Sequence, residues 1–173
     1  MKHREIYPLL ITFLLLTGCA TISTQIQAPC DNPEERMRDL VARHQQIEQV
    51  YNTPMFDDEA RWLKSAYEDF IRDCAKHDEQ AALATRSIGN IHLALEQIDQ
   101  AIAWYDRVAT NYPDQKWEAL QALKSAADTL HDRGDVDRAR QYDQRILTLY
   151  ADENTPDTVA AILRVVRQRT GQP

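Results

Sequence analysis

The fold is decided by residues 82–115, which read ALATRSIGNIHLALEQIDQAIAWYDRVATNYPDQ. Apolar side chains recur in this stretch every three or four positions, which is the period of a helix with one buried face. Two helices are predicted, and their apolar faces consist of Ile88, Ile91, His92 and Leu95 in the first and Ala101, Ile102, Tyr105 and Val108 in the second. Because few residues separate the two helices, they must turn back on each other as an antiparallel hairpin.

Helical periodicity continues along the chain from Asn32, and no stretch combines β-branched residues with the two-residue alternation of a strand. Asn32-Pro33 and Thr155-Pro156 each supply a capping residue and a proline suited to the first helical position. We therefore expect an all-α chain with helices near residues 33–52, 56–76, 79–95, 98–111, 115–132, 135–150 and 156–169. The second helix should bury a face made of Trp62, Leu63, Ala66, Tyr67, Phe70, Ile71 and Cys74.

Residues 82–115 resemble a tetratricopeptide repeat, a family whose pattern includes a glycine, a packing alanine, an aromatic residue and a final proline. The matching residues are Gly89, Ala101, Tyr105 and Pro113, whereas Thr85, His92 and Val108 depart from the family's Trp, Tyr and Ala. Residues 120–151 repeat the pattern loosely, with Ala127, Ala139 and Ile146 at small or packing positions and Asp143 where the aromatic residue is expected. Residues 33–76 form a degenerate first unit.

The resemblance implies antiparallel hairpins stacked as a short solenoid of about three repeats, with residues 156–169 as a capping helix. Ala101 and Ala139 are 38 residues apart, which exceeds the roughly 34 residues typical of the family. The longer hairpin resembles the periplasmic branch, which includes an outer-membrane assembly lipoprotein and a Tol-associated coordinator. A non-repetitive helical bundle with a chance motif match is the alternative.

The first 18 residues are typical of a signal peptide. Lys2 and Arg4 precede an apolar run at 9–16, and this run is shorter than the roughly 20 residues that a spanning helix needs. The run ends in Leu16-Thr17-Gly18-Cys19, which resembles the lipobox of bacterial lipoproteins. That resemblance implies cleavage before Cys19 and a diacylglycerol on its sulfur. An ordinary cleaved signal with a chance cysteine is the alternative.

Residues 19–31 would then be a lipidated tether, followed by a helical domain at 32–173. By resemblance to enterobacterial sorting, Ala20 after the lipidated cysteine points to the periplasmic face of the outer membrane. The chain has a net charge of −7, and removing residues 1–18, which carry +1, leaves −8. This charge argues against nucleic acid as a partner and against adhesion to anionic lipid, so membrane attachment should depend on the lipid.

Cys30 and Cys74 remain once Cys19 is assigned to lipid. In the oxidising periplasm an even pair of cysteines favours a disulfide. A buried free Cys74 with an exposed Cys30 is the alternative.

The sequence contains no recognisable catalytic motif, such as Gly-x-Ser-x-Gly or His-Glu-x-x-His. His44 and Glu48 lie one helical turn apart, but no third metal ligand is evident beside them. We therefore expect no catalytic residue, no metal site and no cofactor, and we do not expect an enzyme.

Binding is the function that the resemblance implies, because the first helix of each hairpin lines a peptide groove in the family. Carried over to this chain, the groove residues are Leu83, Arg86, Asn90, Leu93, Gln121, Lys124, Asp128 and His131. Arg86 and Asn90 lie one turn apart, so both can reach one carboxylate or amide of a peptide. Simple solvation of an exposed face is the alternative.

These observations together predict a lipid-anchored periplasmic adaptor that binds a protein or peptide partner in envelope assembly, secretion or wall remodelling. Two alternatives are a pilotin-type escort of a secretin and an envelope enzyme with an unrecognised site.

Overall fold

The computed structural model describes residues 30–48, 51, 53, 55–150 and 156–171. These residues form seven helices and no strand: α1 (Pro33–Glu48), α2 (Phe56–Asp73), α3 (Asp78–Ala94), α4 (Ile98–Asn111), α5 (Lys116–Asp132), α6 (Val136–Tyr150) and α7 (Asp157–Thr170). The expected all-α fold is confirmed, and most helix ends agree with the sequence to within one or two residues. The first helix does not reach residue 52 as predicted, because Tyr51 lies in a turn, and residues 49, 50 and 52 lie outside the described part of the chain.

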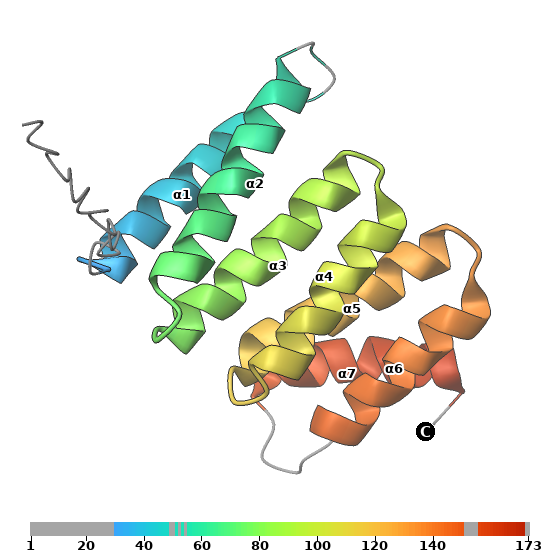
Figure 1. The fold of residues 1–173 in the computed structure, drawn as a ribbon. Coiled ribbons are helices and arrows are strands. Elements are labelled where there is room, and N and C mark those ends of the chain that lie inside the picture. Colours follow the sequence, from blue (N-terminus) through green and yellow to red (C-terminus); the bar gives the residue numbers. More distant parts are fainter. Residues whose placement is uncertain (1–29, 49–50, 52, 54, 151–155, 172–173) are drawn as a thin grey trace, which may run out of the picture.

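Three antiparallel hairpins follow one another along the chain, and α7 packs on α6 at the end of the stack (Figure 1). The backbones of the first helices approach one another, α1 against α3 and α3 against α5. Among the described residues the second helices α2, α4 and α6 show no such approach. The stack therefore curves toward the first helices, and we call the side formed by α1, α3 and α5 the concave face.

The turns inside the second and third hairpins have the same geometry. Glu96 and Gly134, which are 38 residues apart, both have positive φ angles, 57° and 77°. Their N–H groups donate to the carbonyls of Leu93 at 2.9 Å and His131 at 3.0 Å. This is a common way to end a helix with one left-handed residue. Its recurrence at the repeat distance is consistent with two copies of one helical unit.

Two apolar cores hold the stack together. The first lies among α1, α2 and α3 and includes Leu63, Tyr67, Phe70 and Ile88. The second lies among α4, α5, α6 and α7, with Ala82 of α3 added. Burial of these faces is the main stabilising term for such a stack, because no hairpin can cover its own apolar side.

Trp62 does not belong to the buried face of α2 as predicted. Its side chain is 54% exposed, and the guanidinium carbon of Arg43 lies 5.3 Å from its ring centroid. Leu63, the next residue, is fully buried instead. The indole therefore covers the outside of the first hairpin with a cation–π contact to α1.

The expected disulfide between Cys30 and Cys74 is present, with 5.2 Å between the two Cα atoms. It joins the residues before α1 to the end of α2, and so it closes the first hairpin opposite its turn. None of the described helices combines the length and the apolar character needed to cross a membrane.

Candidate binding surface

All eight predicted groove residues lie on α3 or α5, and each is partly exposed. Leu83 packs against the first core and Leu93 against the second. These two leucines therefore contribute to stability as well as to the surface. The other six residues present polar groups along the two first helices.

Arg86 is already paired with a carboxylate of the chain. Its Nε donates to Glu118 Oε2 of α5 at 2.6 Å. The two side chains are only 21% and 14% exposed, so the pair bridges α3 and α5 with little solvent around it. Arg86 and Asn90 were expected to reach one ligand carboxylate together, but each of them has its own internal partner.

The partner of Asn90 is Tyr105 of α4, whose hydroxyl donates to Asn90 Oδ1 at 2.9 Å. The amide oxygen is thereby turned toward α4, which leaves the amide nitrogen as a donor on the concave face. Tyr67 occupies the equivalent place in the first hairpin, 38 residues earlier, and its hydroxyl lies 3.3 Å from His44 Nδ1. Burial raises the pKa of both Tyr67 and Tyr105 to about 12, so both hydroxyls stay neutral hydrogen-bonding groups.

A charged network takes the place of the tyrosine in the third hairpin. Asp143, the residue 38 positions after Tyr105, is 1% exposed. Its Oδ2 lies 2.9 Å from His131 Nε2, and its Oδ1 lies 3.8 Å from Arg169 Nη1 of α7. Asp143 Oδ1 accepts no hydrogen bond from the described residues, so Arg169 faces this oxygen as a charge partner only, while His131 contacts the other oxygen.

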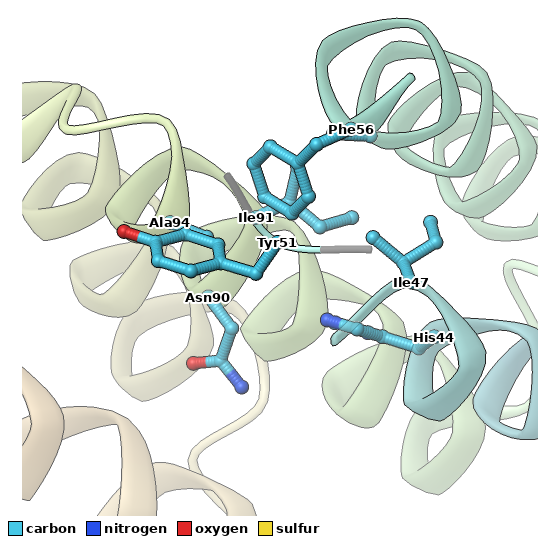
Figure 2. Close-up of a pocket in the computed structure, with 8 residues that line it drawn as sticks. His44, Ile47, Tyr51, Phe56, Asn90, Ile91 and Ala94 are labelled. Atoms are coloured by element: carbon cyan, nitrogen blue, oxygen red, sulfur yellow. The ribbon is translucent and has the colours of Figure 1, made fainter. Parts of the chain in front are cut away.

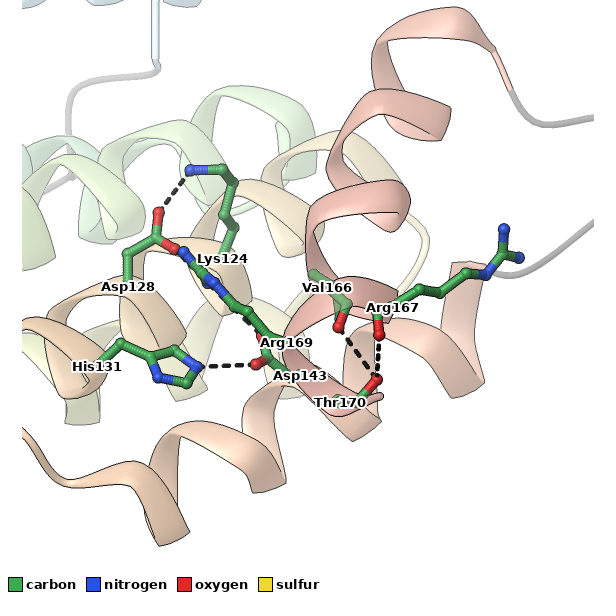
Figure 3. A network of polar contacts seen from close by, with 8 residues as sticks. All are labelled: Lys124, Asp128, His131, Asp143, Val166, Arg167, Arg169 and Thr170. Atoms are coloured by element: carbon green, nitrogen blue, oxygen red, sulfur yellow. Dashed lines mark hydrogen bonds and ion pairs between the residues drawn. The ribbon is translucent and has the colours of Figure 1, made fainter. Parts of the chain in front are cut away.

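Arg169 also joins α7 to the predicted groove. Its Nη1 donates to Asp128 Oδ1 at 2.7 Å, while Lys124 Nζ donates to the other oxygen of Asp128 (Figure 3). Burial alone would raise the pKa of Asp128, but the hydrogen bonds from Lys124 and Arg169 together hold it below its ordinary value. Lys124, Asp128 and His131 are therefore all engaged in contacts within the chain, and Asp128 binds α7 directly.

Among the described residues, two hollows with mainly apolar walls lie between α1 and α3 on the concave face. The first, which we call the Ile91 hollow, has a volume of about 240 Å³ and opens near the C-terminal ends of both helices. Figure 2 shows the His44 ring on the α1 side and Asn90 on the α3 side of this space. Most of the remaining lining is apolar and consists of Ile47, Tyr51, Phe56, Ala60, Ile91 and Ala94.

The second, the Leu83 hollow, lies near the N-terminal ends of the same helices and has a volume of about 280 Å³. Met37, Val41 and Leu83 give it apolar walls. Its charged and polar lining comes from all three first helices and consists of Glu34, Arg38, Glu79, Gln80 and Glu118. Two apolar hollows at opposite ends of one interhelical groove are the shape that apolar side chains of a partner can fill.

The structure thus reveals contacts that the sequence did not. The partners Glu118 and Arg169 come from helices whose positions relative to the groove depend on the packing of the whole stack. One sequence signal favoured a pairing of Asp143 with His131. The repeat pattern places Asp143 at the aromatic position of the second helix and His131 at a groove position of the first helix. Cys19 and the predicted signal peptide lie outside the described residues, as do tether residues 20–29.

No group of three or more His, Cys, Asp or Glu side chains within the described part of the chain is placed to hold a metal ion. In comparisons with protein-family models, curated proteins and solved structures, nothing matches this chain.

Proposed function

We propose that the chain is a lipid-anchored periplasmic adaptor, and that it binds protein partners on the concave face formed by α1, α3 and α5. The observation that carries this proposal is the stack of hairpins itself, which aligns three first helices and leaves two open hollows between α1 and α3. A curved helical stack offers an extended surface that suits a peptide or a helix better than a small substrate.

The proposed compartment has two supports. The Leu16-Thr17-Gly18-Cys19 run follows a short apolar segment, which favours a lipidated N-terminus facing the periplasm. The Cys30–Cys74 disulfide is typical of an oxidising compartment. We extend the proposal to the outer membrane because Ala20 follows the predicted lipidation site.

A matched pair of tryptophan substitutions tests the binding face. Gln121 lies partly exposed on α5, and Gln141 lies exposed on α6. Affinity capture from solubilised membranes should lose its specific proteins with Gln121→Trp and keep them with Gln141→Trp, provided that both variants melt like the wild type. Equal capture by both variants would contradict the assignment of the concave face.

A further inference from the structure

We infer that the partner segment carries a large apolar side chain next to Lys or Arg, and that it docks in the Leu83 hollow. This inference rests on the proposed adaptor function and names the chemistry of its partner. The partner segment would then be basic, although the positive charges of Arg86 and Lys124 alone would favour an acidic partner.

The walls of the hollow select the apolar part of the segment. Met37 in its lining is 4% exposed, and Val41 of α1 and Leu83 of α3 are partly exposed. The volume of about 280 Å³ lies below the roughly 300–1,000 Å³ of small-molecule pockets. It therefore suits one large side chain of a peptide, whose burial would remove apolar surface on both sides from water.

The charges around the hollow select the basic part. Glu34, Glu35 and Glu79 form no ion pair with any described residue. Glu35 lies in a polar depression next to this hollow, which Asn32, His77 and Gln80 also line. Among the described residues that line the hollow and the depression, Arg38 is the one Lys or Arg without an ion pair. Glu118 is neutralised by Arg86. The unpaired charges that remain are negative in excess, so a Lys or Arg beside the apolar anchor would be attracted here.

The two cations among the predicted groove residues are occupied by carboxylates of the chain. Arg86 pairs with Glu118, and Lys124 pairs with Asp128, which also holds Arg169. Recruiting either cation to a ligand carboxylate would leave a partly buried carboxylate of the chain without its partner. The concave face should therefore bind a basic segment more tightly than an acidic one.

The test uses the full-length lipidated chain in detergent micelles and a random short-peptide library displayed on phage. Enriched peptides should place a Leu, Phe, Met or Ile within two positions of a Lys or Arg. A synthetic peptide of the enriched sequence, measured by fluorescence anisotropy, should bind more weakly as NaCl rises from roughly 50 to 500 mM.

Two charge reversals of equal size then locate the site. Glu34→Lys with Glu79→Lys should weaken binding of that peptide by about ten-fold or more, while Asp99→Lys with Asp137→Lys, on α4 and α6, should change it less than about two-fold. Leu83→Ser should weaken binding without any change of charge.

Three results would overturn the inference: enriched peptides that are acidic, enriched peptides without an apolar anchor, or an affinity that Glu34→Lys with Glu79→Lys leaves unchanged. If such peptides still bind and respond to Gln121→Trp, the adaptor function stands and only the docking site is wrong. If the library yields no enriched peptide that binds the chain, both the inference and the proposed adaptor function fail.

Discussion

Gly89 and Tyr105 set the separation between the two helices of the second hairpin. A Cβ atom built on Gly89 would lie 2.5 Å from Tyr105 Cε1 and 2.7 Å from Cδ1. Alanine favours a helix over glycine by about 1 kcal/mol, but overpacking of a core costs about 1–3 kcal/mol. We predict that Gly89→Ala lowers the free energy of unfolding in urea, against what helix propensity alone would give.

A double-mutant cycle separates this clash from other effects. In a Tyr105→Leu background the ring is absent, so Gly89→Ala should be neutral or stabilising. The third hairpin already shows this combination, with Ala127 and Asp143 at the equivalent positions. Equal costs of Gly89→Ala in both backgrounds would show that the Tyr105 ring is not the reason for the glycine.

The Cys30–Cys74 bond should stabilise the first hairpin by restricting the unfolded chain. Its cysteines are 44 residues apart, and loops of this size give about 2–4 kcal/mol. Replacing both cysteines by Ala should therefore lower the free energy of unfolding by about that amount. Mass spectrometry of periplasm-made protein without reductant provides the control, and two free thiols in the folded wild type would contradict the bond.

At the residue scale, a residue's role could be predicted from the sequence where the local structure or the compartment allows few residue types. Gly89 and the cysteine pair are such cases, because a close approach and an oxidising compartment each restrict the choice of residue. Trp62 and Asp143 were less predictable. An indole on an apolar stripe can be buried or can cover the edge of the stripe, and the partner of Asp143 on α7 is visible only when the stack is assembled.

At the scale of helices, α7 is held to the stack by an apolar stripe and one arginine. Leu163 and Val166 are buried, and Arg169 binds Asp128 while facing the charge of Asp143. Arg169→Met would remove the α7 partner of Asp128 and leave the buried Asp143 with His131 alone beside it among the described residues. We predict a loss of about 2–3 kcal/mol in unfolding free energy. Amide hydrogen exchange should accelerate first in α7.

Arg167 supplies the matched control on the same helix, because its side chain is exposed and points away from the network (Figure 3). Arg167→Met should change stability by less than about 0.5 kcal/mol. If the two substitutions cost the same, the ion pairs of Arg169 contribute nothing specific to the docking of α7.

The same contact makes α7 sensitive to acid. The folded pKa of Asp128 lies below its ordinary value of 3.8, so its contribution is present above that value and is lost as the pH falls through the folded pKa. Asp128→Asn should therefore flatten the fall in unfolding free energy below about pH 4. An unchanged slope would mean that other carboxylates account for acid unfolding.

The helices themselves were predictable because the apolar period and the proline positions agree along the chain. The main difference is α1, which was predicted to reach residue 52 and is described as Pro33–Glu48, with Tyr51 in a turn. Apolar periodicity in 47–50 favoured a longer helix, and it could not reveal the turn at Tyr51. The spatial order of the helices followed from short loops, whereas the contact of α7 with Asp128 of α5 did not.

At the scale of the whole molecule, we propose a membrane anchor joined to a helical binding domain. Cys19→Ala, placed behind a cleavable signal peptide, should release the chain from outer membranes into the soluble periplasm, because the anchor is the only membrane contact that we propose. Cell fractionation with immunoblotting measures this. A Cys19→Ala chain that still sediments wholly with outer membranes would require another anchor.

The candidate surface was only partly predictable at this scale. The repeat pattern placed Leu83 and Gln121 on the correct helices and on a partly exposed side. It could not predict that Arg86 and His131 would be paired within the chain, because their partners Glu118 and Asp143 come from other helices. The partner of Lys124 is Asp128, one turn further along α5. The hollows between α1 and α3 are likewise a product of packing between hairpins.

The most direct test of the central claim is a photocrosslinking scan in living cells. A photoreactive amino acid would replace Gln80 of α3 or Gln121 of α5 on the concave face, and Gln100 of α4 or Gln141 of α6 as matched second-helix positions. We predict crosslinks to the same partner protein from Gln80 and Gln121, and none to it from Gln100 or Gln141. Crosslinks confined to the second helices, or equal at all four positions, would contradict binding on the concave face.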